Sequence, residues 1–121
     1  ESIVALKKGL ARNSVSDRCS IYPGDNRQTL RQLQGVADRV ILGLIPSSMN
    51  AWGLAIRCLK DSGGILHIHM NVHENEIDEW AEKTAEWFAT ASGKSTKKIH
   101  IETVKQYCPH IMHVVLDLEI N

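Results

Sequence analysis

Residues 37–48, with the sequence Ala-Asp-Arg-Val-Ile-Leu-Gly-Leu-Ile-Pro-Ser-Ser, decide the fold of this chain. A continuous apolar run that begins after charged residues and ends at a proline is typical of a parallel strand buried on both faces. We therefore predict a strand over residues 40–45. In an open α/β sheet, ligands bind just beyond the carboxyl ends of such strands. The polar bend Pro46-Ser47-Ser48 is accordingly the first candidate for the edge of an active site.

On both sides of this strand, helical and strand patterns alternate along the chain. Apolar residues at helical spacing predict helices, short apolar runs predict strands, and glycine or proline pairs mark turns. The turn between the final two strands is so short that they must pair antiparallel. The expected order is a helix over 2–13, a strand over 19–22, a short helix over 29–34, the strand over 40–45, a helix over 51–60, a strand over 65–72, a helix over 75–91, and strands over 98–107 and 112–120.

This alternation predicts an α/β fold with helices on both faces of a sheet that is mostly parallel and ends in an antiparallel hairpin. A length of 121 residues suffices for one domain with a single core, and no repeat or linker divides the chain. Many S-adenosylmethionine-dependent transferase domains end in such a hairpin. Because one fold serves many functions, the pattern alone does not assign an activity.

The composition is that of a folded chain without a membrane segment. Hydrophobic residues make up 43% and charged residues 23%, which argues against disorder. The formal net charge is zero, so charge neither indicates nor excludes a nucleic-acid partner. No apolar run approaches the ~20 residues that span a bilayer, and there is no signal-peptide pattern. Cys19, Cys58 and Cys108 lack CxxC spacing, so we expect no disulfide framework and a reducing, cytoplasmic setting.

Three blocks of sequence occur in an order and spacing that carry a family resemblance. They are Gly-Asp-Asn-Arg at 24–27, the stretch 37–48 quoted above, and Gly-Gly-Ile-Leu-His-Ile-His-Met-Asn-Val at 63–72. Together with residues 107–119, they closely resemble the carboxyl-terminal half of the eukaryotic wybutosine-synthesising enzymes that act second in that tRNA pathway. The resemblance covers nearly the whole chain.

The resemblance implies a class I, Rossmann-like methyltransferase-type fold and a group-transfer reaction. The expected donor is S-adenosylmethionine, whose 3-amino-3-carboxypropyl group passes to a tricyclic guanosine derivative beside the anticodon of phenylalanine tRNA. Members of this family bind the donor with a glycine-rich turn after the first strand and an acidic residue after the second. This chain has no GxG sequence. We therefore expect 1–121 to be the carboxyl-terminal portion of one transferase domain, lacking its first two strands and inactive by itself. An exposed sheet edge would favour self-association.

The resemblance assigns donor contacts to Asp25, Asn26 and Gly43. Asp25 and Asn26 follow the strand-ending pair Pro23-Gly24. In the family this turn lies against the adenine of the donor, where a carboxylate accepts a hydrogen bond from the exocyclic amine. From the residues alone, an Asx-turn that binds nearby backbone amides also explains the pair. Arg27 is expected to bind a carboxylate and is given no catalytic role.

The bend after the middle strand is expected to carry the reaction. Base-methylating relatives have an Asn-x-Pro-like motif here, and in this chain Gly-Leu-Ile-Pro takes its place. We assign catalytic roles to Pro46 and Ser47, which would align the attacking nitrogen with the bond to the longer arm of the donor. Ser48, Trp52 and Asn71 are the expected substrate contacts. The structural alternative, in which the proline ends a strand and a serine caps the next helix, stays open.

Histidines and tryptophans offer further candidates. His67 and His69 alternate with apolar residues and should share one face of the sheet, but no acidic or cysteine ligand lies at a suitable spacing, so no metal is predicted. Trp80 falls on the apolar stripe of the 75–91 helix and is expected in the core. Trp87 should be partly exposed, and only Trp52 lies near the bend.

Two other functions remain open at this point. One is a methyltransferase of the same superfamily that acts on N1 of a tRNA guanosine. The other is a non-catalytic fragment that binds a partner. The fragment of S-adenosylmethionine that appears on the tRNA separates the first alternative from aminocarboxypropyl transfer, and donor binding separates an enzyme from an interaction fragment.

Overall fold

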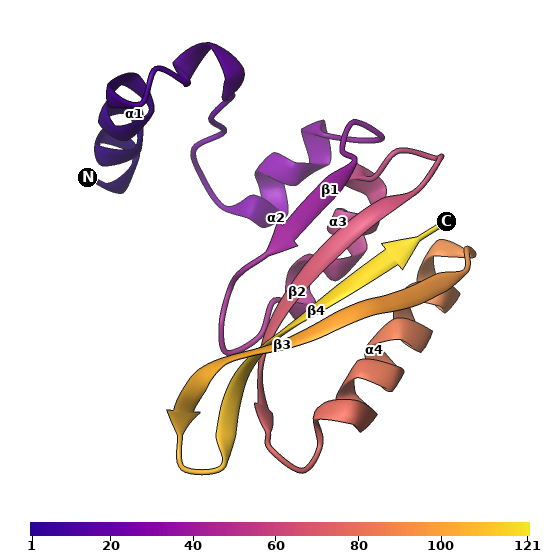
Figure 1. Cartoon of the computed structure of the whole chain (residues 1–121). Coiled ribbons are helices and arrows are strands. Elements are labelled where there is room, and N and C mark those ends of the chain that lie inside the picture. The colour runs from indigo at the N-terminus through magenta and orange to yellow at the C-terminus, as the bar shows by residue number, and fades with distance from the viewer.

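The computed structural model describes residues 1–121, in which four strands form a single sheet (Figure 1). They are β1 (Arg39–Leu42), β2 (Gly64–His73), β3 (Thr96–Cys108) and β4 (Ile111–Ile120), in the spatial order β1-β2-β4-β3. β1 pairs with β2 in parallel, and β4 pairs antiparallel with both of its neighbours. Three strands therefore run in one direction and only β4 opposes them. This confirms the predicted α/β fold with a mostly parallel sheet that ends in a hairpin.

The helices lie close to their predicted positions. They are α1 (Ser2–Arg12), α2 (Asn26–Thr29), α3 (Trp52–Cys58) and α4 (Ile77–Ser92). Short 3-10 turns precede or follow them at Ser16–Arg18, Leu30–Gln32 and Met49–Ala51. No helix is both long and apolar enough to cross a bilayer.

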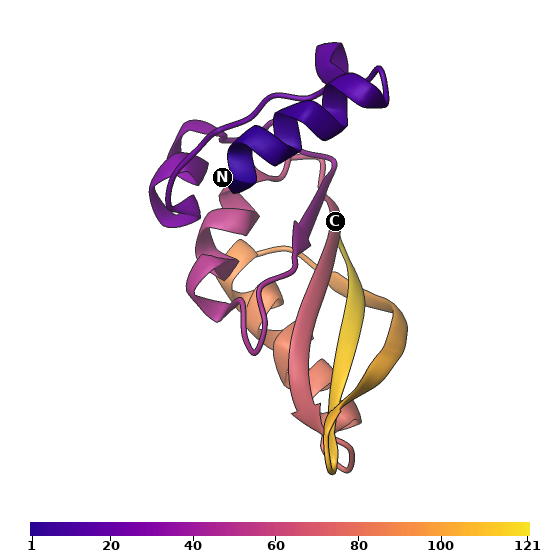
Figure 2. The same cartoon turned by 90° about the vertical axis from the view of Figure 1, so that its left-hand side faces the viewer.

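One face of the sheet, together with α3 and α4, forms the core. Alternate residues of β2 point to this face, and Leu66 and Ile68 there are fully buried. α4 packs against them through buried residues at helical spacing, including Ala81 and Phe88. Complete burial of a side chain such as Phe88 contributes about 1.5–3 kcal/mol relative to leaving it in water. The layer of two helices on one sheet face is visible in the turned view (Figure 2).

The opposite face of the sheet mixes polar residues with apolar ones such as Ile41 and carries no helix layer, so the expectation of helices on both faces is wrong for this chain (Figure 2). Its residues form hydrogen bonds between neighbouring strands. His67 of β2 lies 2.7 Å from the Arg39 guanidinium of β1 and 2.6 Å from the Asp117 carboxylate of β4. His69 of β2 lies 2.9 Å from His113 of β4. These contacts pair polar side chains with one another instead of burying them under a helix.

The predicted strand over 19–22 does not form. Cys19 has an extended backbone, but these residues join no ladder and the sheet gains no fifth strand. A strand exists only through hydrogen bonds to a neighbour, and the outer edge of β1 pairs with no segment of the chain. α1 likewise buries none of its residues and stands apart from the sheet (Figure 1).

β1 is shorter than the predicted 40–45 strand, and this shortening creates the bend. Its pairing with β2 stops at Leu42, opposite Ile68. The chain then leaves the sheet and returns beside the carboxyl end of β2, where Ser47 forms an isolated antiparallel bridge to Met70. The backbone N–H of Asn71 also donates a 3.0 Å hydrogen bond to the carbonyl of Pro46. Residues 43–48 are thus fixed at both ends.

Candidate functional site

A pocket of about 470 Å³ opens beside the carboxyl end of β1. Its walls come from the start of α2, the end of β1 and the turn that precedes α3. Half of its 12 lining residues are hydrophobic, so the pocket combines apolar walls with a few polar groups. Four residues expected at the site line it together: Asp25, Asn26, Gly43 and Ser48.

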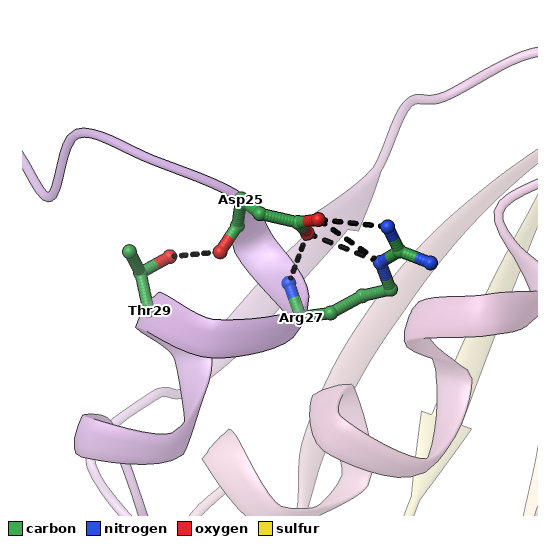
Figure 3. Close-up of polar contacts among 3 residues, drawn as sticks. All are labelled: Asp25, Arg27 and Thr29. Atoms are coloured by element: carbon green, nitrogen blue, oxygen red, sulfur yellow. Dashed lines mark hydrogen bonds and ion pairs between the residues drawn. The ribbon is translucent and has the colours of Figure 1, made fainter.

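Asp25 caps the short helix α2 and pairs with Arg27 (Figure 3). Its carboxylate accepts from the Arg27 backbone N–H at 2.9 Å and from the guanidinium at distances down to 2.8 Å. The Thr29 hydroxyl donates to the Asp25 carbonyl at 3.3 Å. Hydrogen bonds from the Arg27 side chain and backbone lower the pKa of Asp25 to about 2. The Asx-turn alternative is therefore realised, and Arg27 pairs with a carboxylate as expected.

Asn26 and Gly43 offer open surface to the pocket. The Asn26 side chain is exposed and makes no hydrogen bond within the chain, so its amide is free to bind a ligand. Gly43 directly follows β1, and a Cβ placed on it would meet no atom within 4 Å. The wall at Gly43 is therefore backbone with empty space in front of it.

Of the predicted catalytic and substrate residues in the bend, only Ser48 lines the pocket. Pro46 and Ser47 do not line the pocket. The Ile45–Pro46 peptide bond is cis, and the Ser47 hydroxyl accepts from the Met49 N–H at 3.2 Å. Ser48 lines the pocket, and its hydroxyl accepts a 3.1 Å hydrogen bond from the indole of Trp52.

Trp52 and Asn71 lie outside this pocket. Trp52 is only 3% exposed and packs against Phe88 with ring centroids 5.0 Å apart, so it belongs to the core. Asn71 sits near the carboxyl end of β2, and both polar atoms of its side chain are buried without a hydrogen-bond partner. The structure thus brings together the residues that are expected to bind the methionine-derived donor. Two of the expected substrate-binding residues, Trp52 and Asn71, lie apart from them.

Sequence reasoning missed several residues of the pocket wall. Leu30 and Ile41 supply apolar surface, and Asn50 adds a side-chain amide. Ile41 is 69% exposed although it lies in the run that predicted a fully buried strand. The apolar run carries no signal for this exposure, because which face of a strand is covered depends on the rest of the fold. The position of Asn50, directly after the bend, could have identified it as a candidate site residue.

Comparison with known proteins places the chain in a family. A family model described as the TRM5/TYW2 methyltransferase domain matches residues 1–101. The tRNA wybutosine-synthesizing protein 2/3/4 of Arabidopsis thaliana is 48% identical over 97% of this chain, which spans 12% of that relative. The tRNA wybutosine-synthesizing protein 2 homolog of Danio rerio is 42% identical over 98% of this chain, which spans 38% of it. The chain therefore covers well under half the length of these curated relatives.

Solved structures share the fold. TYW2 of M. jannaschii, determined in complex with AdoMet, superposes with a TM-score of 0.86 at 27% identity, over 96% of this chain and 51% of that one. Trm5b of Pyrococcus abyssi superposes with a TM-score of 0.76 at 21% identity, over 96% of this chain and 33% of that one. At 21% identity, the similarity to Trm5b concerns the fold alone. The chain belongs to the TRM5/TYW2 methyltransferase family and has the α/β, Rossmann-like class I fold of its solved members.

Proposed function

We propose that this chain is part of a tRNA-modifying transferase that uses S-adenosylmethionine as co-substrate. It would move the 3-amino-3-carboxypropyl group of this donor to a tricyclic guanosine derivative beside the anticodon of phenylalanine tRNA, in wybutosine biosynthesis. The observation that carries the proposal is the gathering of Asp25, Asn26, Gly43 and Ser48 in one pocket at the carboxyl end of β1. Such strand ends are where open α/β sheets bind their ligands.

The pocket fits a nucleoside-type donor. Its volume of about 470 Å³ is within the usual range for small-molecule sites. The hydrophobic half of the wall, with Leu30 and Ile41, suits the face of an adenine. We expect the free amide of Asn26 to bind the ring edge, because this residue lines the pocket. For Asp25 to accept from the adenine amine, Arg27 must give up part of its bidentate contact, because four hydrogen bonds already occupy the carboxylate.

The bend supplies candidates for the transfer step. Pro46 and Ser47 remain the proposed catalytic pair, with Ser48 and Asn71 as substrate contacts. Displacement at the longer arm of the sulfonium requires the acceptor nitrogen in line with that bond, and positioning supplies much of the rate in such reactions. The bend is anchored to β2 by the Asn71–Pro46 backbone hydrogen bond of 3.0 Å. This anchoring supports a positioning role.

Guanosine N1-methylation is less well supported. The relatives with 42–48% identity carry the wybutosine-synthesizing name, and the superposed TYW2 structure is 27% identical. The Trm5 structures reach 21% and bear on the fold only. A non-catalytic interaction fragment is the remaining alternative.

Two forms of labelled donor test the proposal. The intact transferase that contains this chain is incubated with phenylalanine tRNA that carries either the tricyclic guanosine or an unmodified guanosine at that position, because residues 1–121 are expected to be inactive alone. The S-adenosylmethionine is labelled either in the aminocarboxypropyl arm or in the methyl group. Label from the arm on the tRNA supports the proposal. Label from the methyl group supports the methyltransferase, and no label from either donor, together with no donor binding by calorimetry, supports the interaction fragment.

A cytoplasmic location and self-association are further parts of the proposal. The outer edge of β1 pairs with no other strand, and unpaired edges recruit additional strands. Ile41 on this strand is 69% exposed. Sedimentation over a range of concentrations tests self-association, and a monomer at all concentrations would contradict it.

A further inference from the structure

Three side chains on the open face of the sheet form a line that joins β1 to β4 through β2. The Arg39 guanidinium of β1 lies 2.7 Å from Nε2 of His67. Nδ1 of the same ring lies 2.6 Å from the Asp117 carboxylate of β4. The His67 side chain is only 19% exposed between these two partners. We call Arg39, His67 and Asp117 the cross-strand cluster.

The two partners of His67 determine where its proton lies. Arginine stays protonated in proteins and its side chain only donates hydrogen bonds, so Nε2 of His67 accepts from Arg39. A neutral imidazole carries a single N–H, which is then on Nδ1 and donates to the Asp117 carboxylate. The contacts therefore require a neutral His67 with its proton on Nδ1.

A second proton on this ring would affect the two contacts in opposite ways. On Nε2 it would remove the hydrogen-bond acceptor of the Arg39 side chain and place two cations side by side. The contact between His67 and Asp117 would become an ion pair and grow stronger. Protonation of His67 would thus release β1 from β2 while β2 stays joined to β4.

No other group near the ring replaces His67 as the acceptor for Arg39. The remaining titratable and charged residues on this face are His69 of β2, His113 and Glu119 of β4, and Lys97, His100, Glu102 and Lys105 of β3. His69 pairs with His113 at 2.9 Å, and His100 pairs with Glu102 at 2.7 Å. Asp38, next to Arg39 in sequence, pairs with Lys60 at 2.9 Å. Arg39 itself forms no ion pair, so its contact depends on the charge state of His67.

β1 is the strand whose position depends most on a side-chain contact. It has four residues, pairs with β2 alone, and is joined to β2 by one side-chain hydrogen bond, that between Arg39 and His67. Residues 40–44, from this strand and the turn after it, all line the pocket of about 470 Å³. The position of β1 against β2 therefore sets one wall of this pocket.

We propose that the cross-strand cluster positions the wall of the donor pocket and holds β1 in place only while His67 is neutral. This inference rests on the proposed function and deepens it, because it makes Arg39 and His67 positioning residues for donor binding. Histidine is the side chain that ordinarily changes charge between pH 5 and 8, so the wall should loosen over this range. A single hydrogen bond corresponds to about a 5-fold change in an equilibrium constant, which sets the size of the expected effect.

Nuclear magnetic resonance of residues 1–121 tests the position of the proton. Imidazole 15N shifts distinguish a ring nitrogen that carries a proton from one that does not. At pH 8 we expect a proton on Nδ1 of His67 and none on Nε2, and we expect Nε2 to gain a proton as the pH falls to 5. The backbone amide shifts of residues 39–44 should follow the same titration. A proton on Nε2 at pH 8, or amide shifts of β1 that do not follow His67, would overturn the proposal.

Variants separate His67 from the other histidines of the face. The glutamine of His67→Gln can place its carbonyl oxygen near the position of Nε2 and has no proton to gain. The amide titration of residues 39–44 should therefore disappear in this variant, while His69 still titrates. The matched control is Lys60→Gln, which removes the exposed ion pair with Asp38 just before β1 and should leave the titration unchanged. Loss of the titration in Lys60→Gln as well would contradict the role of His67.

Donor binding is measured by calorimetry with the intact transferase that contains this chain. The probe is 5′-methylthioadenosine, because it lacks the amino and carboxyl groups of S-adenosylmethionine, whose own ionisation would add to the pH dependence. We expect its Kd to rise about 5-fold from pH 7.5 to pH 5.5, and by less than about 2-fold in His67→Gln. Arg39→Gln should bind weakly at both pH values. An equal rise in His67→Gln and in the unmodified protein would overturn the positioning role.

Failure of the proposed function has a different signature. In that case 5′-methylthioadenosine would not bind at either pH, whereas the joint titration of His67 and the β1 amides would persist in residues 1–121. That result would refute donor binding, and with it the role of the cross-strand cluster in positioning a donor.

Discussion

The indole Nε1 of Trp52 donates a 3.1 Å hydrogen bond to the hydroxyl of Ser48, and both residues are only 3% exposed. This contact ties the end of the bend to the first turn of α3. The bend therefore keeps its shape through a side chain of the core as well as through its backbone contacts with β2. The geometry of the pocket, which Ser48 lines, depends on this bond.

Replacing Ser48 with alanine should destabilise the protein. The variant leaves the buried indole N–H of Trp52 without an acceptor, and an unsatisfied buried donor costs about 1–3 kcal/mol. Urea denaturation followed by circular dichroism measures the loss. Ser62→Ala is the matched control, since Ser62 is exposed before β2 and its hydroxyl makes no hydrogen bond; its effect should stay within about 0.5 kcal/mol. Equal stabilities of the two variants would show that the bond contributes nothing.

Gly64 should not tolerate a side chain. A Cβ at this position would press on the backbone carbonyl of Asp38 and lie 2.8 Å from a methyl group of Leu59, where β1 and β2 begin to pair. We expect Gly64→Ala to lower the free energy of unfolding by about 1–3 kcal/mol. The control is Gly53→Ala in α3, where a Cβ meets nothing within 4 Å and alanine favours the helix. An unfolding midpoint for Gly64→Ala equal to that of Gly53→Ala would contradict the packing argument.

The Asp25 carboxyl should titrate near pH 2 in the folded protein, because Arg27 donates hydrogen bonds to its charged form. Any stabilisation from this lowered pKa is present above the ordinary value of 3.8 and disappears as the pH falls toward 2. Carboxyl carbon shifts in an NMR titration measure the pKa. Arg27→Gln should raise it toward 3.8, whereas Arg31→Gln, an exposed arginine of the same segment, should leave it low. A pKa unchanged by Arg27→Gln would refute the pairing.

Much of the fold is predictable because its signals are local. The apolar positions of α4, including Ala81 and Phe88, are the buried ones that the helical spacing predicts. The alternation along β2 and the short turn between β3 and β4 likewise appear as expected. Asp25 and Asn26 meet Gly43 in one pocket, although β1 ends at Leu42 and not at the predicted residue 45.

The failures concern contacts between distant segments. Residues 19–22 have a suitable composition for a strand, but a ladder needs a neighbour that local sequence does not specify. Trp52 lies near the bend in sequence, yet the start of α3 turns its ring into the core against Phe88. All three tryptophans line one hollow between the turn before α3 and the middle of α4. These segments are too far apart along the chain for a sequence motif to reveal that they meet.

The pair His69 and His113 on the open face of the sheet should make stability depend on pH. Partial burial lowers the pKa of His69 below its usual 6.5, and nearby His113 and His67 lower it further, against an opposing effect of Asp117. The unfolded chain therefore binds more protons than the folded one just below pH 6.5, so stability is full above that value and falls as the pH decreases toward the folded pKa. Urea midpoints at pH 7.5 and pH 5.5 measure the fall. His69→Gln should reduce it, while His100→Gln on the exposed strand β3 serves as the control that retains it. If His69→Gln lost as much stability between the two pH values as the unmodified chain, the pH dependence would have to originate elsewhere.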